Sequence, residues 1–114
     1  MIIKGILLFR DAPQVRLDID TNAGRYVSSP VNEDPVLPYE FAVMGINKES
    51  LELFLNERVM PAERQSIKSV LDWAGIPFYD KVLIAERNYY SSCDDDFWIQ
   101  PEDDSITWAE IRKL

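Results

Sequence analysis

The sequence predicts an α+β fold in one small domain that spans residues 1–114. Three observations predict it: alternating apolar and polar residues near the N-terminus, helical patterns in the middle, and an aromatic-rich final segment. A chain of 114 residues is long enough to bury a core and suits a single domain. We therefore expect N-terminal antiparallel strands, two central helices and a short C-terminal aromatic segment.

The first forty residues have the composition of β-structure. Residues 2–9 form an apolar run that is typical of a buried strand. Between residues 15 and 19, apolar odd positions alternate with charged even positions, which indicates a strand with one solvent-facing side. After a turn, residues 25–28 are expected to form a third strand. The three prolines that follow predict an irregular connector over residues 29–40.

Two helices are predicted in the middle of the chain. Asn47 is a suitable N-cap for the first helix, whose apolar face is formed by Leu51, Phe54 and Leu55. The chain breaks near Pro61, which is tolerated in the first turn of a second helix. Gly75 is placed to end that helix. Its predicted apolar face consists of Ile67, Val70, Leu71 and Ala74.

The last third of the chain is less regular. Residues 82–85 are compatible with a short strand or a helical turn, and residues 86–96 have the composition of a polar loop. Residues 97–99 are predicted to be extended. Residues 107–113 are again compatible with a strand or a helical turn.

Charge and composition exclude several functions. Twelve basic residues against 20 acidic ones give a net charge of −8, which disfavours binding to nucleic acid or to anionic membranes. The absence of histidine removes the usual general base and the commonest transition-metal ligand. The acids at 94–96 and 102–104 do not have the spacing of an EF-hand loop. We therefore expect no catalytic residue, no metal and no cofactor.

The expected location is the cytoplasm. A single cysteine, Cys93, cannot form an internal disulfide, which is usual in a reducing compartment. Acids follow it directly and disfavour a reactive thiolate. No apolar run has the roughly 18–20 residues that span a bilayer. The apolar start of the chain lacks a cleavage site before Asp11 and is a better strand than signal peptide.

The stretch CDDDFWIQPEDDSITW, residues 93–108, places large rings between acidic clusters. We expect Trp98 and Trp108 to fill the core as this segment packs over the two helices, with the acids in solvent. An interface edge is the alternative, because aromatic residues are enriched at interface centres. Arg58 and Arg64 flank the helix break and are expected to form exposed ion pairs with the acidic loops, worth about 0–1 kcal/mol each.

Two stretches together resemble the N-terminal, non-catalytic region of HipA-like serine/threonine kinases of Gram-positive bacteria. LELFLNERVMPAERQSIKSVLDWAG is similar to an aromatic-x3-Arg-x-x-Pro-x-x-Arg helix pair, and SSCDDDFWIQPEDDSITWAEI is similar to a segment SLSDxYWxxP…W. The resemblance covers about residues 37–111 and departs from the pattern at Phe54, where tryptophan is expected, and at Asp94 and Asp96. The matching residues are Phe54, Arg58, Pro61, Arg64, Ser92, Asp95, Phe97, Trp98, Pro101 and Trp108.

The resemblance implies a stand-alone counterpart of that region, with no nucleotide-binding or kinase residue to transfer. The first functional hypothesis is therefore a small non-enzymatic interaction module whose protein partner is a kinase or toxin subunit. The second is an acidic inhibitor, encoded by a phage or mobile element, that occupies a nucleic-acid-binding protein by imitating DNA. A carboxylate-dependent enzyme ranks last.

Overall fold

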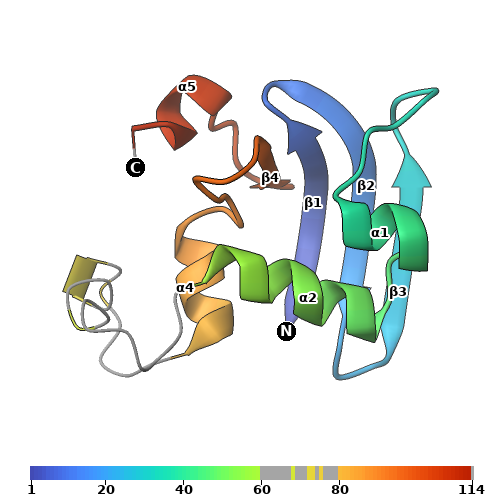
Figure 1. The fold of residues 1–114 in the computed structure, drawn as a ribbon, viewed down its shortest axis with the longest axis horizontal. Coiled ribbons are helices and arrows are strands. Elements are labelled where there is room, and N and C mark those ends of the chain that lie inside the picture. The colour runs from blue at the N-terminus through green and yellow to red at the C-terminus, as the bar shows by residue number, and fades with distance from the viewer. Residues whose placement is uncertain (60–67, 69–71, 74, 76–79, 114) are drawn as a thin grey trace.

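The computed structural model describes residues 1–59, 68, 72, 73, 75 and 80–113 (Figure 1). It confirms the predicted α+β fold, with antiparallel strands first and helices in the middle of the chain. The strands are β1 (Ile2–Phe9), β2 (Ala12–Asp20), β3 (Arg25–Pro30) and β4 (Phe97–Pro101). The described helices are α1 (Tyr39–Met44), α2 (Lys48–Arg58), α4 (Lys81–Arg87) and α5 (Trp108–Ile111).

The strands form one antiparallel sheet in the order β3-β2-β1-β4. The C-terminal strand β4 therefore pairs with β1, with Leu8 opposite Trp98. The pairing of β1 with β2 shifts register between Leu7 and Leu8, and Gln14 is the additional residue of β2. Gln14 is buried, and its side-chain oxygen accepts the Val36 N–H at 2.8 Å. The bulge thereby holds the connector after β3 against the sheet.

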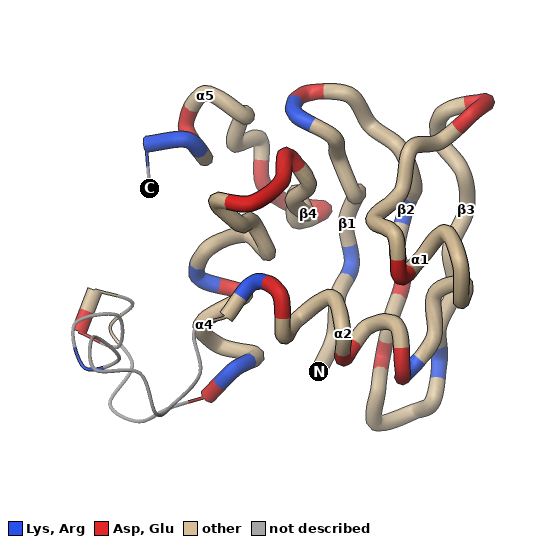
Figure 2. The backbone as a smooth tube through the Cα atoms, viewed as in Figure 1, with Lys and Arg blue, Asp and Glu red and all other residues tan. Residues whose placement is uncertain are grey.

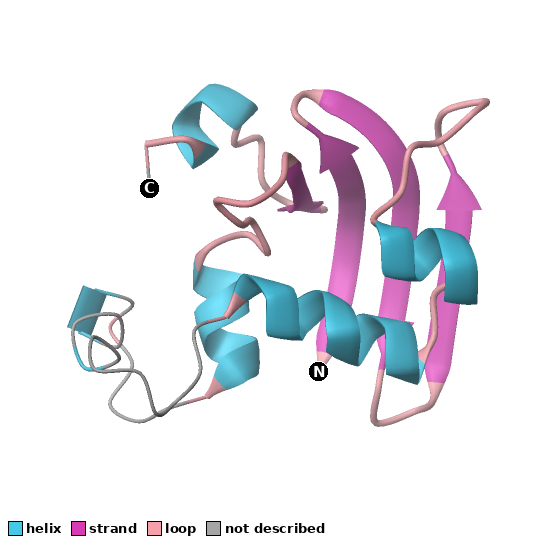
Figure 3. Ribbon diagram, in the orientation of Figure 1, coloured by secondary structure: helices cyan, strands magenta, loops and turns pink. Residues whose placement is uncertain are grey.

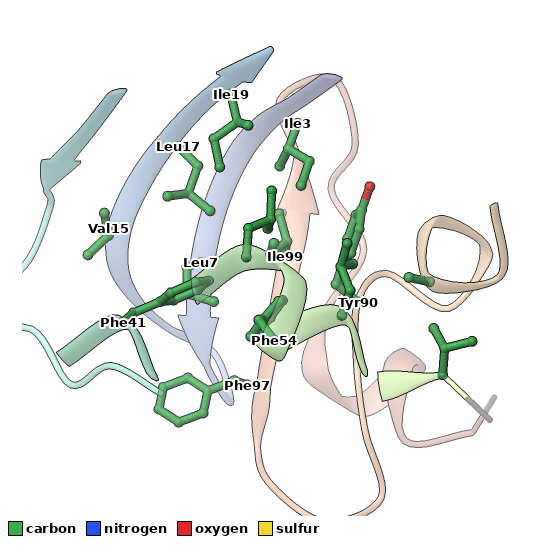
Figure 4. Packing of buried hydrophobic residues seen from close by; sticks show 14 of the residues in the cluster. Ile3, Leu7, Val15, Leu17, Ile19, Phe41, Phe54, Tyr90, Phe97 and Ile99 are labelled. Carbon is green, nitrogen blue, oxygen red and sulfur yellow. The ribbon is translucent and has the colours of Figure 1, made fainter. Parts of the chain in front are cut away.

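The main core lies between the sheet and the helices α1 and α2, which cross one face of it (Figure 3). The alternating residues of β2 point into this core, as their spacing predicts. Phe41 of α1 stacks on Phe54 of α2 with ring centroids 4.9 Å apart. Figure 4 shows these rings packed against residues from the strands, which include Ile3, Leu7, Val15, Leu17, Ile19, Phe97 and Ile99.

A second, smaller core lies on the opposite face of the sheet. It contains Leu8 of β1, Trp98 of β4 and Ile111 of α5, all buried. Phe97 and Ile99 belong to the main core, so successive residues of β4 enter different cores. The prediction that Trp98 fills the core is confirmed, but the prediction that it packs over the two central helices is wrong. The reason is the two-residue period of a strand, which sends Trp98 to the face opposite its neighbours.

Helix α2 has the predicted boundaries. The Asn47 side chain accepts the Ser50 N–H at 3.0 Å, and the Ser50 hydroxyl accepts the Asn47 N–H at 2.9 Å. This reciprocal cap satisfies two backbone donors that the first turn would leave unpaired. The ambiguous residues 82–85 lie in α4, where Asp80 accepts the N–H groups of Val82 and Leu83. Residues 108–111 are also helical.

Three sequence expectations differ from the structure or fall outside it. Strand β3 continues to Pro30, because an edge strand tolerates a residue without an N–H. Helix α1 begins at Tyr39, inside the predicted connector, and its Pro38 N-cap makes no side-chain cap. Burial of Phe41 is the contact that stabilises this short helix. The predicted second helix lies outside the described residues apart from 68, 72, 73 and 75.

Candidate functional site

Arg58, at the end of α2, reaches the loop that precedes β4. Its Nη2 atom lies 3.0 Å and 2.8 Å from the two carboxylate oxygens of Asp95. The guanidinium lies 4.1 Å from the centroid of the Phe54 ring, one helical turn earlier. The Arg58 side chain is fully buried, whereas that of Asp95 is 32% exposed. The predicted ion pair is confirmed, but its predicted exposure is wrong, because the Phe54 ring and the loop enclose the arginine.

Asp95 also controls the backbone at the start of β4. Its Oδ1 accepts the Phe97 N–H at 3.0 Å, on the side of β4 that faces away from β1. The next outward N–H of the strand, that of Ile99, donates to the Tyr89 carbonyl at 2.9 Å. Pro101 has no N–H to offer. The free edge of β4 is thus closed by one carboxylate, one loop carbonyl and a proline.

The rings of β4 are fixed in place on both faces of the sheet. Phe97 packs edge-to-face on Phe9, with centroids 5.2 Å apart. On the other face, the fully buried Trp98 donates its indole N–H to the Arg10 carbonyl at 2.6 Å. Arg10 has φ 57°, a left-handed conformation at the end of β1. Phe97 and Trp98 are therefore structural residues of two different cores.

Trp108 lies only partly buried at the start of α5, beside a groove of about 370 Å³. The indole is approached from one side by Arg112, whose guanidinium carbon is 6.0 Å from a ring centroid. The expectation that Trp108 packs inward is met only in part, since it contacts the edge of the second core. The groove is lined by Asn88, Ser91, Ser92, Cys93, Asp95, Asp96, Trp108, Ile111 and Arg112.

Two acidic residues, Asp95 and Asp96, line this groove together with Arg112, and further acids lie in the loops on either side of β4. Figure 2 shows acidic segments of the chain directly before and after β4. Asp94 and Asp103 are exposed, and Asp96 forms a partly exposed ion pair with Arg10 at 3.0 Å. Asp104 accepts the Tyr89 hydroxyl at 3.1 Å, and desolvation together with this carboxylate raises the pKa of Tyr89. The groove therefore offers one aromatic face beside the arginine-paired carboxylates of Asp95 and Asp96.

The remaining candidates from the sequence are the thiol of Cys93, the acidic clusters and Arg64. The thiol of Cys93 is exposed and its Sγ lies 3.8 Å from Oδ1 of Asp94. Among the described residues, no group of three or more Asp, Glu, Cys or His side chains could hold a metal ion. Arg64, the other predicted candidate, lies outside the described residues. Two contacts that sequence reasoning missed, the carbonyls of Arg10 and Tyr89, are backbone groups without a sequence signal.

No protein-family model, curated protein or solved structure matches this chain. None of the described helices is long and apolar enough to cross a membrane.

Each of the two helices that cover the sheet contributes one acid to a close pair. Glu40 of α1 is buried, and Glu57 of α2 is its acidic neighbour. Burial and the nearby Glu40 charge raise the pKa of Glu57. Because the pKa of Glu57 is higher in the folded chain than in the unfolded chain, protonation of Glu57 stabilises the fold. This stabilisation is fully present below the unfolded-state pKa and is lost as pH rises through the folded-state pKa.

We therefore expect the Glu57→Gln variant to be more stable than the wild type at pH 7, by about 0.5 kcal/mol. The wild type should gain stability as pH falls from 7 towards 5, and this gain should be smaller in the variant. Urea unfolding at several pH values measures both effects. Glu33→Gln, on the exposed connector, controls for the lower net charge. An unchanged or lower stability of Glu57→Gln at pH 7 would contradict the expectation.

Proposed function

We propose that this chain is a non-enzymatic protein-interaction module whose groove beside Trp108 receives a basic segment of a protein partner. The observation that carries the proposal is the combination of a partly exposed indole with carboxylates in one open groove. Aromatic residues at interface centres supply much of the binding energy, and charged rims guide the encounter. A lysine- or arginine-rich segment is complementary to both features.

The charge of the whole chain supports a basic partner. The net charge is −8, and the stretch from residue 93 to residue 111 contains acids and no Lys or Arg. Exposed Asp94 and Asp103 lie in the loops on the two sides of β4. Long-range attraction from such a surface raises the association rate of a cationic segment and weakens with salt.

The resemblance to HipA-like kinases supports a more specific partner. We propose a kinase or toxin subunit of a HipA-like system, with this chain acting as a detached regulatory module. Asp95, Phe97 and Trp98, which carry the resemblance, hold β4 in the sheet. They support a common scaffold, whereas Trp108 is a matching residue that lines the groove and that a partner could reach.

An acidic inhibitor of a nucleic-acid-binding protein is the second candidate, and the charge of −8 is the observation that favours it. A DNA mimic needs carboxylates in rows on one face. In Figure 2 the acids are distributed over β2, the connector, the helices and the C-terminal loops. This distribution favours the first candidate. Competition by duplex DNA for the partner would favour the second.

The experiment compares three baits in pull-downs from the source cell: the wild type, Trp108→Ala and Leu53→Ala. Leu53 is 46% exposed on α2, is not among the residues that line the groove, and serves as the exposed apolar control. We expect the wild type and Leu53→Ala to recover a kinase-like subunit that Trp108→Ala does not retain. With the purified pair, affinity should fall steeply with salt. Equal recovery by Trp108→Ala, or no binding at micromolar concentration, would contradict the proposal.

A further inference from the structure

The two edges of the sheet differ in how far their outward backbone groups are covered or paired. The β4 edge is closed by Asp95, Tyr89 and Pro101, as described above. The opposite edge is β3, whose residues are exposed except for the half-buried Tyr26. Natural sheets usually guard such an edge with charges, bulges or a covering segment. The only charged residue of β3 is Arg25, which pairs with Asp18 of its own sheet at 3.2 Å.

The hydrogen-bond pattern identifies which groups of β3 face outward. The Val31 N–H donates to the Gln14 carbonyl at 2.9 Å, so odd-numbered residues from 25 to 31 face β2. The Thr21 N–H donates to the Met1 carbonyl at 3.0 Å, which places the odd residues of β2 towards β1 and agrees with this assignment. The even residues of β3 therefore direct their backbone groups away from the sheet.

Tyr26 and Ser28 thus present their N–H and C=O groups on the free edge. Pro30 adds a carbonyl and no N–H, which limits the length of any new ladder. No described residue accepts the N–H of Tyr26 or Ser28. Two groups of each kind, spaced two residues apart, form a short template for an antiparallel strand.

We propose that β3 pairs with β3 of a second copy of this chain, antiparallel and about a twofold axis at Val27. In this register Tyr26 of one copy lies opposite Ser28 of the other. Every outward N–H and C=O of these two residues then finds a partner in both copies. A shift of the register by two residues in either direction leaves some of these N–H or C=O groups without a partner. The outward groups themselves therefore favour the register centred on Val27.

The side chains of the edge are compatible with this contact. Val27 is 48% exposed and would meet its own counterpart, and Arg25 would lie opposite Ser29, so no like charges face each other. Near the edge Arg16 and Arg25 balance Asp18 and Asp20, on a chain whose net charge is −8. Two copies therefore meet through a locally neutral part of an acidic molecule.

Helix α1 adds apolar surface on the same side. It lies over β2 and β3 in Figure 1, and its Tyr39 and Val43, one turn apart, are 80% and 63% exposed. A twofold axis perpendicular to the sheet keeps the helices of both copies on one face. The two α1 helices would then approach each other across the new junction and cover part of this apolar surface.

The first test compares Ser28→Pro with Ser28→Ala by sedimentation equilibrium at about 100 µM chain, a concentration at which weak dimers are populated. Proline removes the outward N–H of residue 28 and leaves the ladder with β2 intact, whereas alanine keeps it. We expect dimers for the wild type and Ser28→Ala, and a rise of about tenfold or more in the dissociation constant of Ser28→Pro. Circular dichroism checks that each variant is folded.

The second test determines the register in which the two β3 strands pair, without destabilising either strand. In a Cys93→Ser background, Val27→Cys should form an intermolecular disulfide on mild oxidation, because residues opposite each other across the axis lie within disulfide range. Ser29→Cys is the matched control, and its two copies lie too far apart to react. A monomeric wild type, an unchanged Ser28→Pro dimer, or equal crosslinking at both positions would overturn the proposal.

Discussion

Replacing Trp98 by alanine is expected to lower the free energy of unfolding by about 4 kcal/mol. The side chain is fully buried and contacts Leu8 and Ile111 in the second core. Its removal leaves a cavity between β4 and α5. The folded protein then loses both the transfer free energy and the packing contacts of the indole. It also leaves the Arg10 carbonyl without the indole donor that lies 2.6 Å away. Urea unfolding at constant pH measures the loss.

Two further variants separate the causes of this loss. Trp98→Phe keeps most of the apolar volume and removes the indole N–H, so it is expected to cost about 1–2 kcal/mol. Trp108→Ala removes the same side chain from a partly buried site and is expected to cost less than Trp98→Ala. A Trp98→Ala loss no larger than that of Trp108→Ala would contradict the assignment of Trp98 as the anchor of the second core.

The strands and α2 could be predicted because their signals are local. The alternation between residues 15 and 19 fixes which side chains of β2 enter the core. Asn47 caps α2 with the side chain that N-cap statistics favour. Residues 82–85, for which the sequence allowed a strand or a helical turn, are helical, and the side chain of Asp80 caps their helix α4. Such features depend on neighbours within a few positions and not on the rest of the fold.

The features that sequence reasoning missed depend on distant residues. Arg58 is buried because the loop around Asp95, 37 residues later, closes over it. Helix α1 lacks a side-chain cap and depends on Phe41 packing against Phe54. Tyr89, whose carbonyl closes the β4 edge, has φ 53°, a conformation that its residue type does not indicate. Each is a tertiary contact that no local pattern encodes.

The structure changes the meaning of the resemblance motif. Asp95, Phe97 and Trp98 together close one edge of the sheet and anchor β4 in two cores. The residues of such a segment are required by the fold itself. Proteins of similar sequence can therefore share the segment without sharing a binding partner. The two proposals therefore rest on other features, the partly buried Trp108 beside its groove and the backbone of the β3 edge.

Replacing Asp95 by alanine is expected to lower the free energy of unfolding by about 3 kcal/mol, the lower end of the range for breaking a buried pair. The fully buried guanidinium of Arg58 would lose its counterion, and the Phe97 N–H would lose its acceptor. Asp95→Asn keeps a side-chain oxygen for that N–H and removes the charge, so it should recover part of the loss. Thermal and urea unfolding of all variants measure these differences.

The matched control is Asp96→Ala at the next position. Its ion pair with Arg10 is partly exposed, with side chains 34% and 63% accessible, so the expected cost is about 0–1 kcal/mol. Arg58→Met combined with Asp95→Ala removes both charges, and it should be less destabilised than the sum of the single losses. Additive losses, or equal effects at Asp95 and Asp96, would show that the enclosed pair does not hold the β4 loop to α2.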